Sequence, residues 1–175
     1  MSTELKMRKV LIFGNSSAGK STLAKRLIDK DDLLHLDLDT IAWRKVESSC
    51  NEPPVRMPLT ESGRLIQAFT QSAEECNLGW VIEGCYTDLL ELAKAAADEI
   101  IFLNLSIDEC LKNAMARPWE PHKYESKEQQ DANLSMLLAW IKEYETRTDD
   151  FSFMAHQQFY ENFGGVKTMM TKRDD

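Results

Sequence analysis

The residues with the clearest chemical potential form the segment GNSSAGKS, residues 14–21, between an apolar run and a stretch with helical periodicity. The segment fits G-x-x-x-x-G-K-[ST], whose glycines let the backbone curl so that successive N–H groups point inward. The next helix adds the positive end of its dipole, the Lys20 ammonium can neutralise phosphate charge, and the Ser21 hydroxyl suits Mg²⁺. The segment predicts a cradle for the phosphates of ATP, formed by Gly14, Asn15, Ser16, Ser17, Ala18, Gly19, Lys20, Ser21 and Thr22.

Two aspartates end the apolar segment LLHLDLD, residues 33–39. Because side chains alternate along a strand, Asp37 and Asp39 are expected to face one side, at the edge of a parallel sheet where ligands bind. We assign Asp37 to hydrated Mg²⁺, and Asp39 to a hydrogen bond or a proton from an acceptor hydroxyl. The alternative is that Asp39 only caps a helix that starts at Thr40.

Glu83 and Gly84 follow the apolar WVI, residues 80–82. A carboxylate at the end of a strand beside a phosphate cradle is a candidate metal ligand, although acids at loop starts are commonly solvated. Gly84 either lets a substrate approach the backbone closely or forms a simple turn. The predicted metal set is therefore Ser21, Asp37 and Glu83, and Gly84 is assigned to the acceptor.

Strands and helices must alternate to position these residues. Apolar runs at 9–13, 33–39, 80–84, 99–105 and 166–170 predict strands, and helical periodicity predicts helices at 21–28, 60–76, 88–97, 106–116, 131–147 and 152–163. Helices between consecutive strands imply a parallel sheet covered on both faces. We therefore predict an α/β chain with three α/β/α layers, a parallel sheet of about five strands and the fold of a P-loop NTPase.

Composition limits the classes of partner. The 175 residues suit one domain, 1–175, and a formal charge of −8 disfavours nucleic acid, because phosphate binding needs a concentrated basic surface. No apolar run suits a membrane helix and no secretory signal is recognisable, so we expect a cytoplasmic protein with no membrane partner. The four cysteines lie far apart and predict reduced thiols. A monomer and a homodimer both stay open.

Two segments have little periodicity. Residues 44–59 contain three prolines and predict a functional loop on the acceptor side. Residues 117–130 contain almost no aliphatic side chains and predict a lid.

The lid contains basic and aromatic side chains with alternative interpretations. For His122, Lys123 and Lys127 we favour a solvated loop, because charge runs usually face water. Trp119 and Tyr124 either stack on adenine or pack in the core or at a hinge. Outside the lid, His35 and His156 are assigned structural roles.

The order of these motifs resembles a known family. A P-loop at 14–21, Asp37-Leu38-Asp39 some twenty residues later, Glu83-Gly84 and a basic lid resemble the nucleoside-monophosphate-kinase-like group of small P-loop kinases, shikimate kinases in particular. LDTIAW (38–43) and WVIEGCY (80–86) also resemble bacterial P-loop proteins described as topology-modulation or adenylate-kinase-like proteins. The resemblance covers most of the chain up to the lid. It implies Mg²⁺-dependent transfer of the γ-phosphate of ATP to a hydroxyl or phosphate of a small metabolite.

The resemblance also implies residue roles. The implied catalytic residues are Lys20, Asp39 and Arg117, the last at the point where relatives supply an arginine to the transferring phosphoryl group. Gly84-Cys85-Tyr86 stands where shikimate kinases carry a run of glycines, and no arginine occupies an unambiguous position for a substrate carboxylate. Arg56 and Arg64 are both candidates for an anionic group on a hydroxylated acceptor.

Two other functional classes stay open. The cradle could serve a nucleotide-binding regulator or slow ATPase, with the helices at 131–147 and 152–163 docking a partner. A nucleic-acid-associated ATPase is disfavoured by the acidic balance. A lid and an acceptor-side aspartate favour the phosphotransferase, because a switch needs no pocket for an acceptor.

Overall fold

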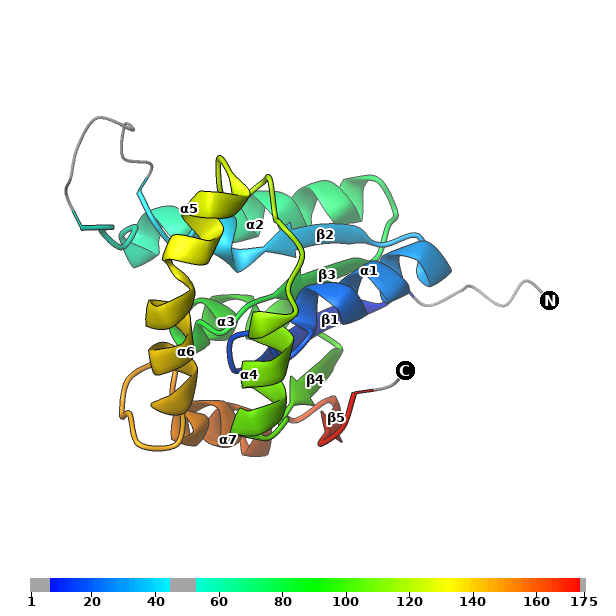
Figure 1. Ribbon diagram of the computed structural model, residues 1–175. Coiled ribbons are helices and arrows are strands. Elements are labelled where there is room, and N and C mark those ends of the chain that lie inside the picture. Colours follow the sequence, from blue (N-terminus) through cyan, green and yellow to red (C-terminus); the bar gives the residue numbers. More distant parts are fainter. Residues whose placement is uncertain (1–6, 45–52, 174–175) are drawn as a thin grey trace.

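Five parallel strands form one sheet at the centre of the molecule, in the order β2-β3-β1-β4-β5 (Figure 1). The computed structural model describes residues 7–44 and 53–173. The strands are β1 (Lys9–Gly14), β2 (Leu34–Asp37), β3 (Trp80–Glu83), β4 (Glu99–Leu103) and β5 (Val166–Met170). The predicted α/β fold with a parallel sheet of about five strands is confirmed.

Helices cover both faces of the sheet and make three layers (Figure 1). The helices on one face are α2 (Leu59–Glu75), α3 (Thr87–Ala93) and α7 (Phe153–Glu161). The helices on the other side are α1 (Lys20–Asp31), α4 (Ile107–Met115) and α6 (Leu134–Lys142), of which α6 packs against α4. A 3₁₀ turn, η2 (Lys94–Ala96), extends α3.

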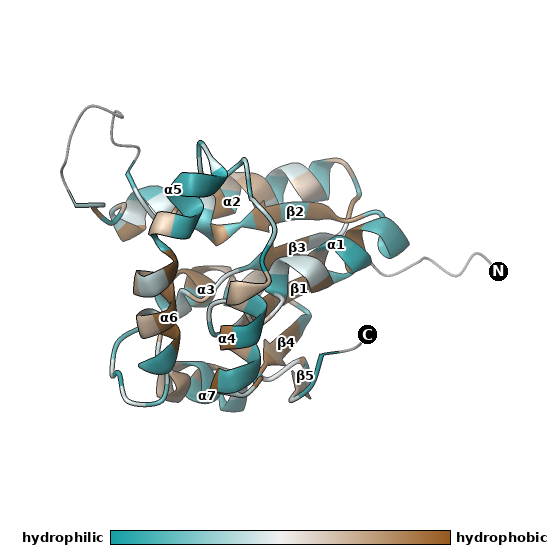
Figure 2. Ribbon diagram, in the orientation of Figure 1, coloured by the Kyte–Doolittle hydropathy of each residue, from teal (hydrophilic) through white to brown (hydrophobic). Residues whose placement is uncertain are grey.

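Alternation along β1 shows why both faces need a cover. Leu11 and Phe13 belong to the core under α2, α3 and α7, whereas Val10 and Ile12 belong to the core under α1, α4 and α6. All four side chains are fully buried. Figure 2 shows the same division, with hydrophobic strands between helices whose outer faces are largely hydrophilic.

The second strand ends earlier than predicted, at Asp37. Leu38–Thr40 forms a 3₁₀ turn, η1, because the Asp37 carboxylate accepts a hydrogen bond from the Asp39 N–H at 2.9 Å and the Thr40 hydroxyl donates to the Asp37 carbonyl. The expectation that Asp37 and Asp39 share one strand face is therefore wrong. Asp37 is the capping residue, and the turn carries Asp39 to the end of the sheet.

The predicted helix at 131–147 is also divided. The chain forms a short helix, α5 (Lys127–Ala132), inside the predicted lid and then α6, with Asn133 between them. Ser126 caps α5 by accepting a hydrogen bond from the Gln129 N–H. The remaining lid residues, 117–126, stay irregular, and five of them line the same cavity as Glu83 and Gly84 at the end of β3.

The predicted loop at 44–59 is described only at its ends, since residues 45–52 lie outside the described part. Trp43 and Arg56 form an antiparallel bridge there.

Among the predicted reduced cysteines, Cys50 lies outside the described residues, and Cys76, Cys85 and Cys110 are free thiols. No helix in the described ranges combines the length and apolar character that a membrane crossing requires.

Candidate active site

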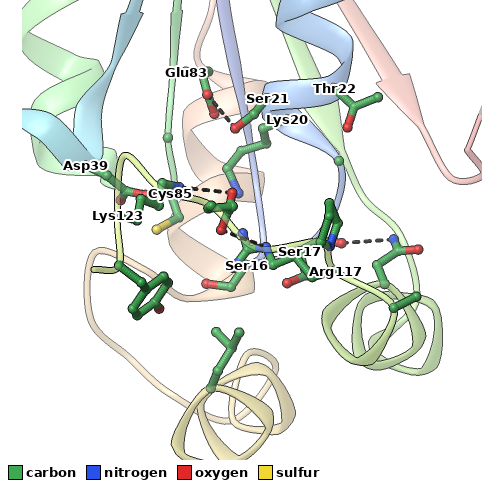
Figure 3. Close-up of a pocket in the computed structure, with 18 of the residues that line it drawn as sticks. Ser16, Ser17, Lys20, Ser21, Thr22, Asp39, Glu83, Cys85, Arg117 and Lys123 are labelled. Atoms are coloured by element: carbon green, nitrogen blue, oxygen red, sulfur yellow. Dashed lines mark hydrogen bonds and ion pairs between the residues drawn. The ribbon is translucent and has the colours of Figure 1, made fainter. Parts of the chain in front are cut away.

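A cleft of about 370 Å³ opens where the P-loop, the ends of β2 and β3, α4 and the lid meet (Figure 3). The predicted site residues that line it are Ser16, Ser17, Gly19, Lys20, Ser21, Thr22, Asp39, Glu83, Gly84 and Arg117. Residues from distant parts of the sequence therefore share one cavity. Its position at the carboxyl ends of parallel strands is where α/β sheets bind ligands.

The P-loop has the backbone geometry of a phosphate cradle. Ser17 and Gly19 have φ values of 60° and 93°, in the left-handed region, so the N–H groups between them can converge. Gly14 has φ 147°, and a Cβ there would lie 2.4 Å from the carbonyl oxygen of Leu103. Any side chain at Gly14 would therefore displace β4 or unwind the loop.

Two side chains hold the cradle in shape. The Lys20 ammonium donates to the carbonyl oxygens of Asn15 at 2.8 Å and Gly14 at 3.3 Å. The buried Asn15 amide donates to the carbonyl of Ile141 in α6, and its Oδ1 accepts from the Ser16 N–H. Asn15 thus links the loop to α6, while Lys20 bonds to backbone carbonyls of the loop, which a bound phosphate can replace.

Ser21 and Glu83 form the first polar pair of the cleft. The Ser21 hydroxyl donates to Glu83 Oε1 at 2.7 Å (Figure 3). Nε2 of His35 lies 3.3 Å from the same oxygen. Burial opposes ionisation of Glu83, but the bonds from His35 and Ser21 and the charge of Lys20 outweigh it, so its pKa is lowered. Glu83 is therefore an anion beside the P-loop.

Asp39 is oriented by Tyr86 and Trp43, two aromatic residues that the sequence analysis did not assign. The Tyr86 hydroxyl donates to Asp39 Oδ1 at 2.5 Å, and it accepts from Trp43 Nε1 at 2.9 Å. The Tyr86 ring is buried, and its pKa is raised by burial and by the charge of Asp39. Tyr86 is therefore a permanent donor that fixes one oxygen of Asp39 and leaves the other toward the cleft.

Lys123 approaches Asp39 from the lid, contrary to the solvated role favoured for it (Figure 3). Its ammonium lies 2.9 Å from Asp39 Oδ2, 3.7 Å from Asp37 and 4.0 Å from Glu120, and its side chain is 19% exposed. Burial alone would lower the pKa of Lys123, but these carboxylates raise it. Desolvation opposes ionisation of Asp39, but Lys123 and Tyr86 lower its pKa overall.

Asp37 does not line the cleft, which removes the geometric basis of its predicted metal role. Its side chain is 12% exposed and caps η1. Burial, together with the negative charges of Glu83 and Asp39, raises its pKa. The structure gives Asp37 the role of a cap that positions Asp39, and its role beside hydrated Mg²⁺ stays a prediction.

Arg117 lies in the cleft as predicted, and the lid around it is held at its base. Its Nε lies 3.1 Å from Glu120 Oε2, which directs the guanidinium along the cleft wall. Gln130, from α5, accepts from the Glu120 N–H at 2.9 Å and donates to the carbonyl of Pro118 at 3.0 Å. The lid is thus bonded to α5 rather than free in solvent.

Arg56 and Arg64 do not reach the cleft, so their predicted acceptor role is not supported by geometry. The Arg56 guanidinium donates to Asp88 at 2.8 Å and stacks over Trp43, Tyr86 and Phe151. Arg64 is exposed on α2. Arg56 is instead a structural residue that supports the aromatic group behind Asp39.

Gly84 and Cys85 form the floor of the cleft beneath Asp39. A Cβ at Gly84 would lie 2.8 Å from the Leu38 side chain, so the glycine lets η1 pack close to β3. Gly84 also lines the cleft. The group that approaches its backbone closely is the Leu38 side chain. The Cys85 sulfur points into the cleft (Figure 3), and burial raises the pKa of its thiol to about 12.

The opposite end of the cleft is lined by residues from α4, the lid and the segment after β5. Asn113 donates to the Ser17 carbonyl at 2.9 Å and accepts from Arg173 at 3.3 Å. Tyr124 lines the cleft, whereas Trp119 is 44% exposed and donates to the Tyr124 carbonyl. Of the two predicted stacking candidates, only Tyr124 lies in the cleft wall.

The histidines assigned structural roles differ in their surroundings. His156 is fully buried; its Nε2 donates to the Cys85 carbonyl and its Nδ1 accepts from the Tyr144 hydroxyl. Burial lowers the pKa of His156 to about 4. His156 is therefore a neutral tether beneath the cleft floor, whereas His35 contacts the cleft residue Glu83.

No protein-family model and no curated protein matches the sequence. Among solved structures, an unliganded sugar kinase from a Janibacter species aligns over 97% of this chain and 87% of its own, with a TM-score of 0.54 and 12% identity. A gluconokinase from Sinorhizobium meliloti aligns over 95% and 84%, with a TM-score of 0.49 and 12% identity. An uncharacterized protein from Eubacterium ventriosum aligns over 97% and 92%, with a TM-score of 0.48 and 18% identity. The likeness to the sugar kinase shows that this chain has the α/β/α fold of P-loop kinases.

Proposed function

We propose that the protein is an ATP-dependent phosphotransferase that moves the γ-phosphoryl group of ATP to a hydroxyl of a small metabolite. The observation that carries the proposal is the convergence of the P-loop Lys20 and the lid-covered carboxylate of Asp39 in one cleft of about 370 Å³. The names of the solved sugar kinase and gluconokinase are in keeping with this activity. Membership in the shikimate-kinase-like group stays a prediction.

The phosphates of ATP would lie in the P-loop. The N–H groups between Ser16 and Ser21 and the start of α1 would bind their oxygens, and Lys20 would exchange its bonds to the Asn15 and Gly14 carbonyls for the phosphates. Arg117 would stabilise the charge that spreads over the transferring group.

The Ser21–Glu83 pair suits a phosphate-bound Mg²⁺. In the described ranges, no three His, Cys, Asp or Glu side chains are grouped to hold an ion by themselves. A Mg²⁺ ion bound together with a nucleotide would need only one or two protein oxygens, because the phosphates and water would supply the rest. Ser21 and Glu83 lie beside the P-loop with their oxygens 2.7 Å apart and would supply those ligands. When bound, the ion would neutralise charge on the β- and γ-phosphates.

Asp39 would orient the acceptor hydroxyl and accept its proton. The acceptor oxygen then forms a bond to the γ-phosphorus while the bond from that phosphorus to the bridging oxygen of ADP breaks. Tyr86 holds one oxygen of Asp39, so the other faces the reacting hydroxyl. The lid would exclude water, which would otherwise compete as the acceptor.

A two-stage assay tests the proposal. A thermal-shift screen of ATP–Mg²⁺ with hydroxylated metabolites should show a larger rise in melting temperature for ATP plus acceptor than for ATP alone. The compounds found should then stimulate ADP formation. If ATP binds and no hydroxylated compound raises the rate of ADP formation, the regulatory ATPase becomes the better account.

A further inference from the structure

We infer that the acceptor is a small uncharged polyhydroxyl compound whose reacting hydroxyl binds between Asp39 and Lys123. The inference rests on the proposed function and replaces the anionic acceptor expected from Arg56 and Arg64. It makes Lys123 the residue that selects for a hydroxyl. Four features of the cleft support it.

The first feature is the charge balance around Lys123. Its ammonium has the carboxylates of Asp39, Asp37 and Glu120 within 4.0 Å. The nearby guanidinium of Arg117 is itself paired with Glu120 at 3.1 Å. Two cations are thus paired with three carboxylates, of which Asp39 and Glu120 line the cleft and Asp37 does not. Neither cation is left over for a charge on the acceptor.

The second feature is the placement of four other basic residues, two that line the cleft and two that were predicted to bind the acceptor. Lys20 belongs to the P-loop, and Arg173 lies at the end beside Asn113 and Ser17. Arg56 is paired with Asp88, and Arg64 is exposed on α2. An acceptor carboxylate or phosphate near Asp39 would therefore meet the Asp39 carboxylate, and the cation beside it, Lys123, is already paired with carboxylates.

The third feature is the hydrogen-bonding character of the Asp39–Lys123 pair. Lys123 donates to Asp39 Oδ2 at 2.9 Å, so an acceptor group must enter between a pure donor and a pure acceptor. A hydroxyl satisfies both, because it accepts from the ammonium and donates to the carboxylate. A carboxylate can only accept and an ammonium can only donate.

The fourth feature is the cleft's size and lining. About 370 Å³ must hold both the phosphates and the acceptor, which limits the acceptor to a few carbon atoms. The cleft is also lined by Glu120, Tyr124 and Cys85, whose side chains carry a carboxylate, a phenol and a thiol. These groups suit further hydroxyls on the acceptor.

Matched acceptors test the inference. One series is sorbitol, gluconate and 1-amino-1-deoxysorbitol, which differ only in a neutral, anionic or cationic group at one carbon. The corresponding shorter series is glycerol, glycerate and 3-aminopropane-1,2-diol. We expect the neutral member of the preferred series to have a kcat/KM at least about tenfold above either charged member, the factor typical of one charge-assisted contact.

Two lid variants and a control locate the selectivity. Lys123→Met should lower kcat/KM for the neutral acceptor by about tenfold or more while the KM for ATP stays within about twofold. Glu120→Gln removes one negative charge and should narrow the preference for the neutral over the anionic member by about threefold or more. The control is Lys127→Met, which changes an exposed lid lysine paired with Asp131. It should leave kcat/KM for the neutral acceptor and the preference for the neutral over the anionic member unchanged.

The outcomes separate the two proposals. Transfer to an acceptor with preference for a charged member, or with less than about threefold discrimination, overturns the inference and keeps the phosphotransferase. The same holds if Lys123→Met behaves like Lys127→Met. If no member of either series receives phosphate but another hydroxylated compound from the screen does, the acceptor class falls and the phosphotransferase stays. If ATP binds and no hydroxylated compound in the screen receives phosphate, the proposed function falls and the acceptor class falls with it.

Discussion

The Tyr86 hydroxyl lies 2.5 Å from Asp39 Oδ1 and donates a hydrogen bond to it, although 47 positions separate the two residues in the sequence. Tyr86 is held in turn by Trp43 Nε1 and by the guanidinium of Arg56, which stacks on its ring. Asp39 is exposed to 40% in the cleft, yet one of its oxygens is held by a buried group. A carboxylate held in this way keeps a fixed direction toward a reacting hydroxyl.

Tyr86→Phe should reduce turnover without disturbing nucleotide binding. The variant keeps the buried ring and removes one hydrogen bond to Asp39, so we expect kcat to fall by about tenfold while the KM for ATP stays within about twofold. Steady-state kinetics with varied ATP and varied acceptor measure both quantities. Tyr160→Phe, outside the cleft, is the matched control. Equal losses in kcat and ATP affinity would assign Tyr86 to general packing.

Lys20→Ala should abolish tight ATP binding and leave the fold intact. Within residues 7–44 and 53–173 the ammonium hydrogen-bonds to two P-loop carbonyls, so its loss costs little folding free energy, whereas a charge-assisted contact to phosphate contributes about 1.5–3 kcal/mol. Calorimetry should show ATP–Mg²⁺ binding weakened by at least about tenfold. Lys25→Ala, exposed on α1, serves as the control. Unchanged affinity in Lys20→Ala contradicts the nucleotide cradle.

Glu83→Gln should raise the Mg²⁺ concentration needed for half-maximal rate by about tenfold, because the side chain keeps its shape and loses the charge beside Ser21. A Mg²⁺ titration at saturating ATP measures this value. A companion variant, Ser21→Ala, removes the hydroxyl of the other proposed ligand. Its control is Ser72→Ala, which removes a hydroxyl from an exposed position on α2. A Mg²⁺ requirement that neither Glu83→Gln nor Ser21→Ala changes would place the ion elsewhere.

His156 should make the protein less stable in acid. Its pKa is lowered from 6.5 to about 4 by burial, so the unfolded chain binds a proton that the folded chain rejects between these values. The stability contribution is complete above pH 6.5 and is lost as the pH falls toward 4. We expect the free energy of unfolding to drop by about 2 kcal/mol from this group between pH 7.5 and 5.

Urea denaturation at the two pH values tests the role of His156. His156→Gln should remove this part of the pH dependence, whereas His122→Gln, at an exposed lid position, should retain it. An identical pH dependence in wild type and His156→Gln would show that His156 is not held neutral in the folded state.

The P-loop was predictable because its chemistry is local. Glycines, a lysine and a serine at fixed spacing between a strand and a helix define the backbone path, and the structure places Lys20 and Ser21 in the cleft. The sheet was predictable for a similar reason, since continuous apolar runs such as 9–13 are buried on both faces.

The acceptor side was less predictable because its contacts join distant residues. Lys123 looks like a solvated lid charge until the fold brings it to Asp39, 84 positions away. Arg56 looks like an anion receptor until Asp88, 32 positions away, pairs with it. The position of Asp39 in the cleft was predicted, but for the wrong reason. The prediction assumed that Asp39 belongs to a strand, whereas the η1 turn, capped by Asp37, places it. Pairing partners, rather than residue types, decide these roles.

The most direct test of the phosphotransferase is the fate of the γ-phosphate. Wild-type protein is incubated with γ-labelled ATP, Mg²⁺ and the acceptor from the screen, and label is measured on the acceptor and as inorganic phosphate. We expect most label on the acceptor, and we expect Asp39→Asn to lower that transfer by at least about a hundredfold while ATP affinity changes by less than about threefold. Label found only as inorganic phosphate, at a rate that Asp39→Asn does not change, would contradict phosphoryl transfer and favour a regulatory ATPase.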